Sequence, residues 1–173
     1  MKEKIMPPLV LMLISVVVCA LLVAANAATK DKIVQAQEDK FNQSLSDTFG
    51  DADYTSVDID IDGIDSVTRD QNGRIIFEVT ADGYAKGGLH LLIGFDSDGA
   101  IEGISFLSIG ETPGLGTKVQ EDKSFIEQFR GVSSADYDFS TITGATYSSK
   151  GMKSAVDLAL NAYTEHKEEI LNG

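Results

Sequence analysis

An uncharged apolar segment near the N-terminus most constrains how this chain can fold. From Leu9 to Ala25 no side chain is charged, and the only polar ones are Ser15 and Cys19. With its flanking residues the segment approaches the roughly 20 residues that a membrane span needs. It is either a signal peptide cleaved after Ala25–Ala27 or a permanent anchor. Its uncharged core exceeds the roughly 7–15 residues of a signal-peptide core, which favours the anchor.

Both interpretations export the rest of the chain. The sequence therefore predicts a cytoplasmic tail and transmembrane signal anchor over residues 1–28, and an extracytoplasmic domain over residues 29–173. The expected location is the inner (plasma) membrane, crossed once. The net charge of −13 argues against a nucleic acid partner, because phosphate binding needs a basic surface. One cysteine excludes an intrachain disulfide and a cysteine-bound cluster, and His90 and His166 lack metal-ligand spacing, so no metal site is expected.

Apolar periodicity after the anchor predicts an α+β domain. A helix is expected over residues 29–49, with Thr29 as its N-cap. Strand-like segments follow at residues 54–63, 74–81, 87–95 and 100–109, and helices at residues 121–129 and 150–171. Strands joined by short turns and flanked by helices indicate an antiparallel sheet. The expected buried faces are Leu89, Leu91, Ile93 and Phe95 in the sheet, and Met152, Val156, Ala159, Leu160 and Tyr163 in the last helix.

Three aspartates alternate with apolar residues in the first predicted strand. Asp58, Asp60 and Asp62 lie on one face, which raises the alternative of a calcium site. Carboxylates at alternate strand positions are about 7 Å apart and rarely converge on one ion, which favours a solvated face.

A hydroxyl-rich loop, "FSTITGATYSSKGM" (Phe139–Met152), precedes the last predicted helix. Gly144 permits a sharp turn, Ala145 adds little bulk, and Thr146 stands where free backbone N–H groups favour an anion. One interpretation is a phosphate site assisted by Ser148 and Ser149. The alternative is a polar loop in which one of these serines is the N-cap.

A second loop, "GETPGLGTKV" (Gly110–Val119), has no periodicity and follows an apolar strand. Pro113 and Gly114 fit positions i+1 and i+2 of a turn. Such a glycine-rich loop suits a flat ligand pressed against the backbone. The alternative is a plain loop that carries Glu111.

The motifs "ETPGLG" (Glu111–Gly116) and "TGAT" (Thr143–Thr146) together resemble the FMN-binding domain shared by the G subunit of the Rnf complex and the C subunit of the sodium-pumping NADH:quinone reductase. The resemblance covers nearly the whole chain. It implies FMN attached as a phosphoester to the Thr146 hydroxyl by a separate flavin transferase. The implied flavin-lining residues are Glu111, Thr112, Gly114, Leu115, Gly116, Thr117, Thr143, Gly144, Ala145 and Ser148.

By the same resemblance the chain is a redox subunit that works with the other membrane subunits of an ion-translocating complex, rather than an enzyme by itself. The chain departs from the family pattern in two places. The acid six residues before the modified threonine is replaced by Ser140, with Asp138 two residues earlier, and the histidine or lysine often found before the Glu-Thr-Pro run is replaced by Ile109 and Gly110. Three alternatives remain: an anchored flavoprotein that serves an external acceptor, a regulatory FMN-binding module without redox function, and an exported structural protein without a cofactor.

Overall fold

A computed structural model describes residues 2–172, which form parts of two compact units, Met1–Phe41 and Asn42–Gly173. Helix α1 (Lys2–Phe49) makes up the first unit and contributes its last two turns to the second. Its apolar N-terminal part has a mean hydropathy of 2.9 over 18 residues, so by length and composition it can cross a membrane.

Helix α1 continues without a break through the predicted boundary at residue 29. The Thr29 hydroxyl donates to the Ala25 carbonyl at 2.9 Å inside the helix, so the prediction of an N-cap at Thr29 is wrong. Residues 22–36 include five alanines, the residue with the highest helix propensity, and no glycine or proline. Among the apolar residues of the helix predicted over residues 29–49, Ile33 is exposed, whereas Leu45 and Phe49 are buried.

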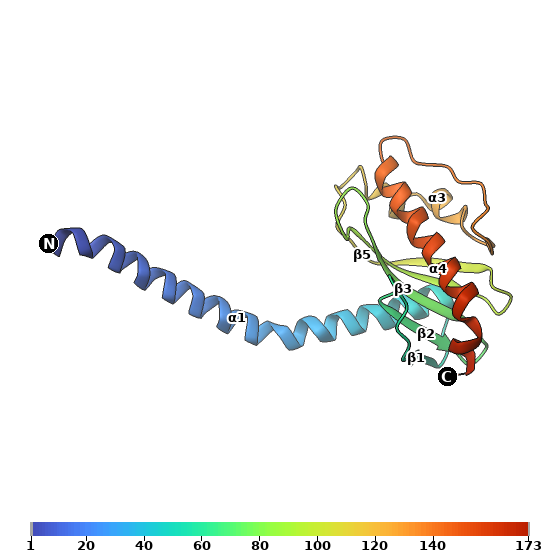
Figure 1. The fold of residues 1–173 in the computed structure, drawn as a ribbon, viewed down its shortest axis with the longest axis horizontal. Helices are drawn as coiled ribbons and strands as arrows, with labels where there is room; N and C mark the ends of the chain where they lie inside the picture. The colour runs from blue at the N-terminus through green and yellow to red at the C-terminus, as the bar shows by residue number, and fades with distance from the viewer. Residues whose placement is uncertain (1, 173) are drawn as a thin grey trace. The chain divides into compact units, whose positions relative to one another are not determined.

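The second unit is built on a five-stranded sheet in which each strand pairs antiparallel with the next (Figure 1). Its strands are β1 (Tyr54–Val57), β2 (Ser66–Asp70), β3 (Ile75–Ala81), β4 (Leu89–Phe95) and β5 (Ile101–Ile109). Two short helices, α2 (Lys118–Glu121) and α3 (Lys123–Glu127), and the long helix α4 (Thr146–Asn172) follow. The predicted antiparallel α+β architecture is confirmed.

The first predicted strand, residues 54–63, is wrong in extent because β1 ends at Val57. Asp58, Asp60 and Asp62 are exposed on an irregular segment that turns at Gly63, where φ is +78°. Strand β2 was not predicted, because its buried positions include the polar Thr68 and Asp70. Asp70 accepts hydrogen bonds from the backbone N–H groups of residues 72 and 74, which explains a buried carboxylate in the β2–β3 hairpin.

Helix α4 packs on one face of the sheet against β3 and β4 (Figure 1). The predicted core residues of strand β4 and of the last helix are all buried. Phe95 stacks on Tyr163 with ring centroids 4.9 Å apart. This contact fixes α4 on the sheet and thereby positions the start of the helix near the β3–β4 loop.

The last two turns of α1 cover the opposite face. The ring of Phe49 lies against Gly94, where any Cβ would overlap it, so glycine is required there. Arg74 donates to the Phe49 carbonyl at 2.8 Å and to Glu102 at 2.9 Å, and pairs with Asp70 at 3.2 Å. Burial lowers the Arg74 pKa, but the hydrogen bond and charge of Glu102 outweigh it, and the net pKa is raised. The end of α1 is therefore fixed to the sheet.

Candidate functional site

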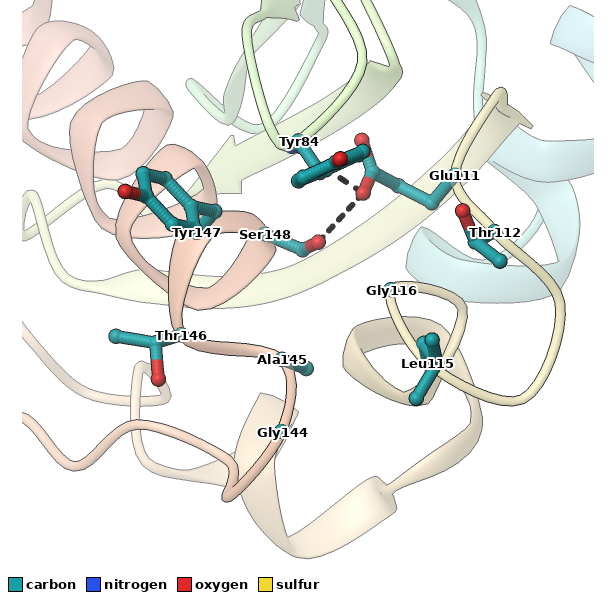
Figure 2. A pocket seen from close by; sticks show the side chains of 10 residues that line it. All are labelled: Tyr84, Glu111, Thr112, Leu115, Gly116, Gly144, Ala145, Thr146, Tyr147 and Ser148. Atoms are coloured by element: carbon teal, nitrogen blue, oxygen red, sulfur yellow. Dashed lines mark hydrogen bonds between the residues drawn. The ribbon is translucent and has the colours of Figure 1, made fainter.

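Three segments converge on one pocket of about 330 Å³: the β3–β4 loop, the β5–α2 loop and the start of α4 (Figure 2). The pocket is lined by Tyr84, Glu111, Thr112, Leu115, Gly116, Gly144, Ala145, Thr146, Tyr147 and Ser148. Eight of these were predicted from the sequence. Gly114, Thr117 and Thr143 were also predicted but do not line it, and Thr143 borders a separate open depression beside Asp122 and Ser124.

The β5–α2 loop contains the predicted turn. Gly114 has a φ of +73°, and the Leu115 N–H donates to the Thr112 carbonyl at 3.1 Å, as expected for Pro at i+1 and Gly at i+2. The Thr117 hydroxyl accepts from the Gly114 N–H at 2.9 Å. Gly114 and Thr117 therefore shape this loop, while Thr112, Leu115 and Gly116 present themselves to the pocket.

Glu111 joins the three segments. It is 5 % exposed, and its carboxylate accepts from the N–H groups of Tyr84 at 3.2 Å and Ala85 at 3.0 Å. The Ser148 hydroxyl donates to the same carboxylate at 2.5 Å. Hydrogen bonds to the ionised form compensate the desolvation of a buried carboxylate. Glu111 thus holds the pocket walls together and is itself one of the pocket-lining residues.

Glycines leave the space that the Glu111 side chain fills. A Cβ on Gly83, Gly88 or Gly116 would overlap atoms of Glu111, and one on Gly116 would also lie 2.7 Å from the Ser148 hydroxyl oxygen. The glycine of "GLG" at residue 116 is therefore explained by close packing rather than by chain flexibility.

Helix α4 begins four residues earlier than predicted. The Gly144 φ of +83° turns the chain, the Ala145 N–H donates to the Ile142 carbonyl at 2.9 Å, and the helix starts at Thr146. Ser148 and Ser149 thus lie within the first turn, and neither is the N-cap. Both serines are buried, and both hydroxyls are hydrogen-bonded. The Ser148 hydroxyl donates to Glu111, and the Ser149 hydroxyl accepts from the Ile142 N–H at 3.1 Å. Serines so engaged do not compete with the helical backbone, which explains the earlier start.

The start of α4 has the properties of an anion site. The backbone N–H groups of Thr146, Tyr147 and Ser148 donate no hydrogen bond to the protein within residues 2–172, as expected for a first helical turn. The positive end of the helix dipole is at the same place. Thr146 is exposed, so its hydroxyl is accessible beside these three donors.

Within the described part of the chain, no three His, Cys, Asp or Glu side chains lie close enough together to hold a metal ion. His90 instead pairs with Glu78 at 2.7 Å, and His166 with Glu169 at 3.4 Å.

Two pocket residues, Tyr84 and Tyr147, were not predicted from the sequence. Tyr147 directly follows Thr146, so its proximity to the second motif was a signal that could have identified it. Tyr84 lies just before the third predicted strand, away from both motifs in the sequence, and carried no such signal. The rings approach edge to face, with centroids 6.3 Å apart at 73°.

Comparison with known proteins places this pocket in a recognised domain. The family model of the FMN-binding domain matches residues 83–161, which contain all three pocket segments. The G subunit of the ion-translocating oxidoreductase complex of Shewanella baltica is 30 % identical over 94 % of this chain and 90 % of its own length. The corresponding proteins of Cereibacter sphaeroides (30 %, covering 94 % and 85 %) and Aliivibrio fischeri strain MJ11 (29 %, covering 94 % and 91 %) are similar over comparable lengths.

Proposed function

The chain belongs to the family of the G subunits of ion-translocating oxidoreductase complexes, and from this premise we propose that it carries FMN and transfers electrons within such a complex. The observation that carries the proposal is the exposed Thr146 hydroxyl beside three free backbone N–H groups, at the mouth of a pocket inside the FMN-binding domain. Bound flavin accepts and releases electrons singly or in pairs, and the protein positions and tunes it.

The residues present fit a phosphate-linked flavin. The free N–H groups of Thr146, Tyr147 and Ser148 would bind the phosphate oxygens. Gly144 and Ala145 leave room at the helix start, and Thr112 and Leu115 line the pocket wall opposite. The occupied hydroxyls of Ser148 and Ser149 favour backbone donors over serine hydroxyls as the phosphate ligands.

We propose that the link is covalent and is made by a separate flavin transferase. Thr146 Oγ would attack the diphosphate of FAD; the new bond joins Oγ to the FMN phosphorus, the diphosphate bond breaks and AMP leaves, with the hydroxyl proton passing to the transferase. The exposure of Thr146 supports attachment by a foreign active site. Asp138 and Ser140 are exposed as well, so the segment before Thr146 is available for recognition.

The membrane arrangement is also a proposal. Residues 1–28 would form the tail and anchor, and residues 29–173 the extracytoplasmic FMN-binding domain, assembled with other membrane subunits of the complex. The apolar part of α1 supports the anchor, and the hydrogen bond from Arg74 to the Phe49 carbonyl ties the end of this helix to the sheet.

The experiment is to express the full chain with a flavin transferase and to measure flavin fluorescence after denaturing electrophoresis. Thr146→Ala should abolish the signal, because the attachment hydroxyl is gone. Thr143→Ala is the matched control, since Thr143 is an exposed threonine of the same motif that does not line the pocket. Covalent flavin that persists in Thr146→Ala would contradict the proposal. In a separate experiment, co-purification of the wild-type chain with other membrane subunits would support the proposal that the chain works within a complex.

A further inference from the structure

Large apolar side chains are exposed at only one place in residues 35–172. They are Tyr84, Leu115 and Tyr147, which are 76 %, 51 % and 71 % exposed. All three line the pocket described above, although each comes from a different segment of the chain. Single exposed apolar residues are ordinary, but three that converge on one pocket mark a binding surface.

The two tyrosines form one aromatic wall. Tyr84 extends from the β3–β4 loop and Tyr147 from the first turn of α4, and the rings meet edge to face with centroids 6.3 Å apart. Leu115 lies across the pocket from them in the view of Figure 2. Both tyrosines line the same pocket as Thr146, the residue that precedes Tyr147.

The backbones of Tyr84 and Tyr147 are held by the fold, whereas their side-chain hydroxyls are not hydrogen-bonded within the described residues. Glu111 accepts from the N–H groups of Tyr84 and Ala85, which holds the β3–β4 loop, and α4 holds Tyr147. Neither tyrosine hydroxyl makes a hydrogen bond within the described residues. The rings are thus positioned without hydrogen-bonding to the protein within the described residues, as expected for groups that contact a ligand with their rings.

The ligand that fits is a planar aromatic ring system. Aromatic side chains gain from offset stacking and from covering apolar area, and stacking on a flat heterocycle tolerates a partly open site. We propose that Tyr84 and Tyr147 hold the isoalloxazine ring of the FMN attached at Thr146 by direct ring contact. This assignment rests on the proposed function, and it makes both tyrosines cofactor-positioning residues.

Flavin fluorescence tests the contact independently of electron-transfer activity. A phenol in van der Waals contact quenches excited flavin by transferring an electron to it, and the electron then returns. The full chain, flavinylated by the transferase, is compared with Tyr84→Leu, Tyr147→Leu and the double variant, each normalised to its flavin absorbance. We expect the fluorescence lifetime to rise severalfold in the double variant and the visible circular dichroism of the flavin to weaken.

Tyrosine-to-phenylalanine variants separate ring contact from electron donation. Tyr84→Phe and Tyr147→Phe should lengthen the lifetime while they keep the circular dichroism, because phenylalanine still packs but is a poor electron donor. Tyr54→Leu is the control, because Tyr54 lies on edge strand β1 and does not line the pocket. The flavin fluorescence lifetime of this variant should equal that of the wild type. Folding is not at risk at two side chains that are more than two-thirds exposed.

The outcomes are distinguishable. A wild-type chain without flavin absorbance would overturn the proposed function together with this inference. Normal flavin loading with an unchanged lifetime in the double leucine variant would overturn the inference alone. The same unchanged lifetime with loss of complex assembly would also overturn it and assign the tyrosines to protein docking.

Discussion

The hydroxyl of Ser148, in the first turn of α4, donates a 2.5 Å hydrogen bond to the carboxylate of Glu111, in the β5–α2 loop. The two residues are 37 positions apart in sequence; Glu111 opens the first motif, and Ser148 lies two residues after the second. Their contact joins the start of α4, which would bind the flavin phosphate, to the loop that would line the flavin ring. The stability of the domain and the geometry of its pocket are therefore linked.

Loss of the Ser148 hydroxyl should destabilise the fold. Ser148→Ala removes a hydrogen bond to a charged group at a 2 % exposed position, a cost of about 2 kcal/mol. For a chain of this size that lowers Tm by roughly 4–8 °C. Glu111→Gln should cost at least as much, because its amide NH₂ would face a backbone N–H or the hydroxyl donor. Thermal unfolding of the detergent-solubilised chain measures both.

Ser154→Ala is the matched control for these variants, since Ser154 is exposed on the same helix. It should change the free energy of unfolding by no more than about 0.5 kcal/mol. Equal stability of Ser148→Ala and Ser154→Ala would show that the Glu111 contact contributes nothing.

Gly151→Ala should destabilise the chain although it improves helix propensity. A Cβ at Gly151 would overlap the Asp82 carbonyl oxygen and lie 3.0 Å from the Gly83 Cα, so the β3–β4 loop must move. Overpacking of this kind costs about 1–3 kcal/mol, against a propensity gain of about 1 kcal/mol. Thermal unfolding gives the net sign, and a higher Tm than wild type would show that the loop yields freely.

Ser140→Asp should raise the fraction of chains that carry flavin. The change restores the acid that the resemblance places six residues before the modified threonine, at an exposed position whose N–H donates to the Gln128 side chain. The ratio of flavin absorbance to protein, at limiting transferase, is the measurement. Ser134→Asp, which adds the same charge at another exposed serine, should leave the ratio unchanged; an equal rise would indicate a general charge effect.

The Tyr137 side chain should make the free energy of unfolding depend on pH in the alkaline range. Burial first, and then the charge and hydrogen bond of Asp157, raise the pKa of Tyr137 above its unfolded value of 10.0. The folded chain holds this proton more tightly, so the contribution is fully present below pH 10 and is lost as the pH rises through the folded pKa. The stability gap between wild type and Tyr137→Phe should be constant below pH 10 and shrink above it. A constant gap throughout would contradict this assignment.

Periodicity predicted the elements whose side chains pack on the core. Strands β3 to β5 and the α4 stripe were correct because alternating or helical apolar residues report burial directly. Strand β2 was missed because Asp70 is buried through local hydrogen bonds, which hydropathy does not register. The early start of α4 was missed for the same reason, since the partners of Ser148 and Ser149 are distant or precede the helix.

The candidate site was predicted from its motifs, and the structure adds the relations between them. Sequence reasoning placed Glu111 and Ser148 in the pocket but not in contact, because that contact depends on how α4 lies on the sheet. Tyr84 was not identified, since only the folded β3–β4 loop brings it to Tyr147.

The most direct test of the central claim is the mass of the tryptic peptide Gly131–Lys150, which contains Thr146. The full chain, purified from cells with an active flavin transferase, should give this peptide with the added mass of FMN less water, and fragmentation should locate the addition on Thr146. An unmodified peptide, or the flavin on another hydroxyl of the same peptide, would contradict the account.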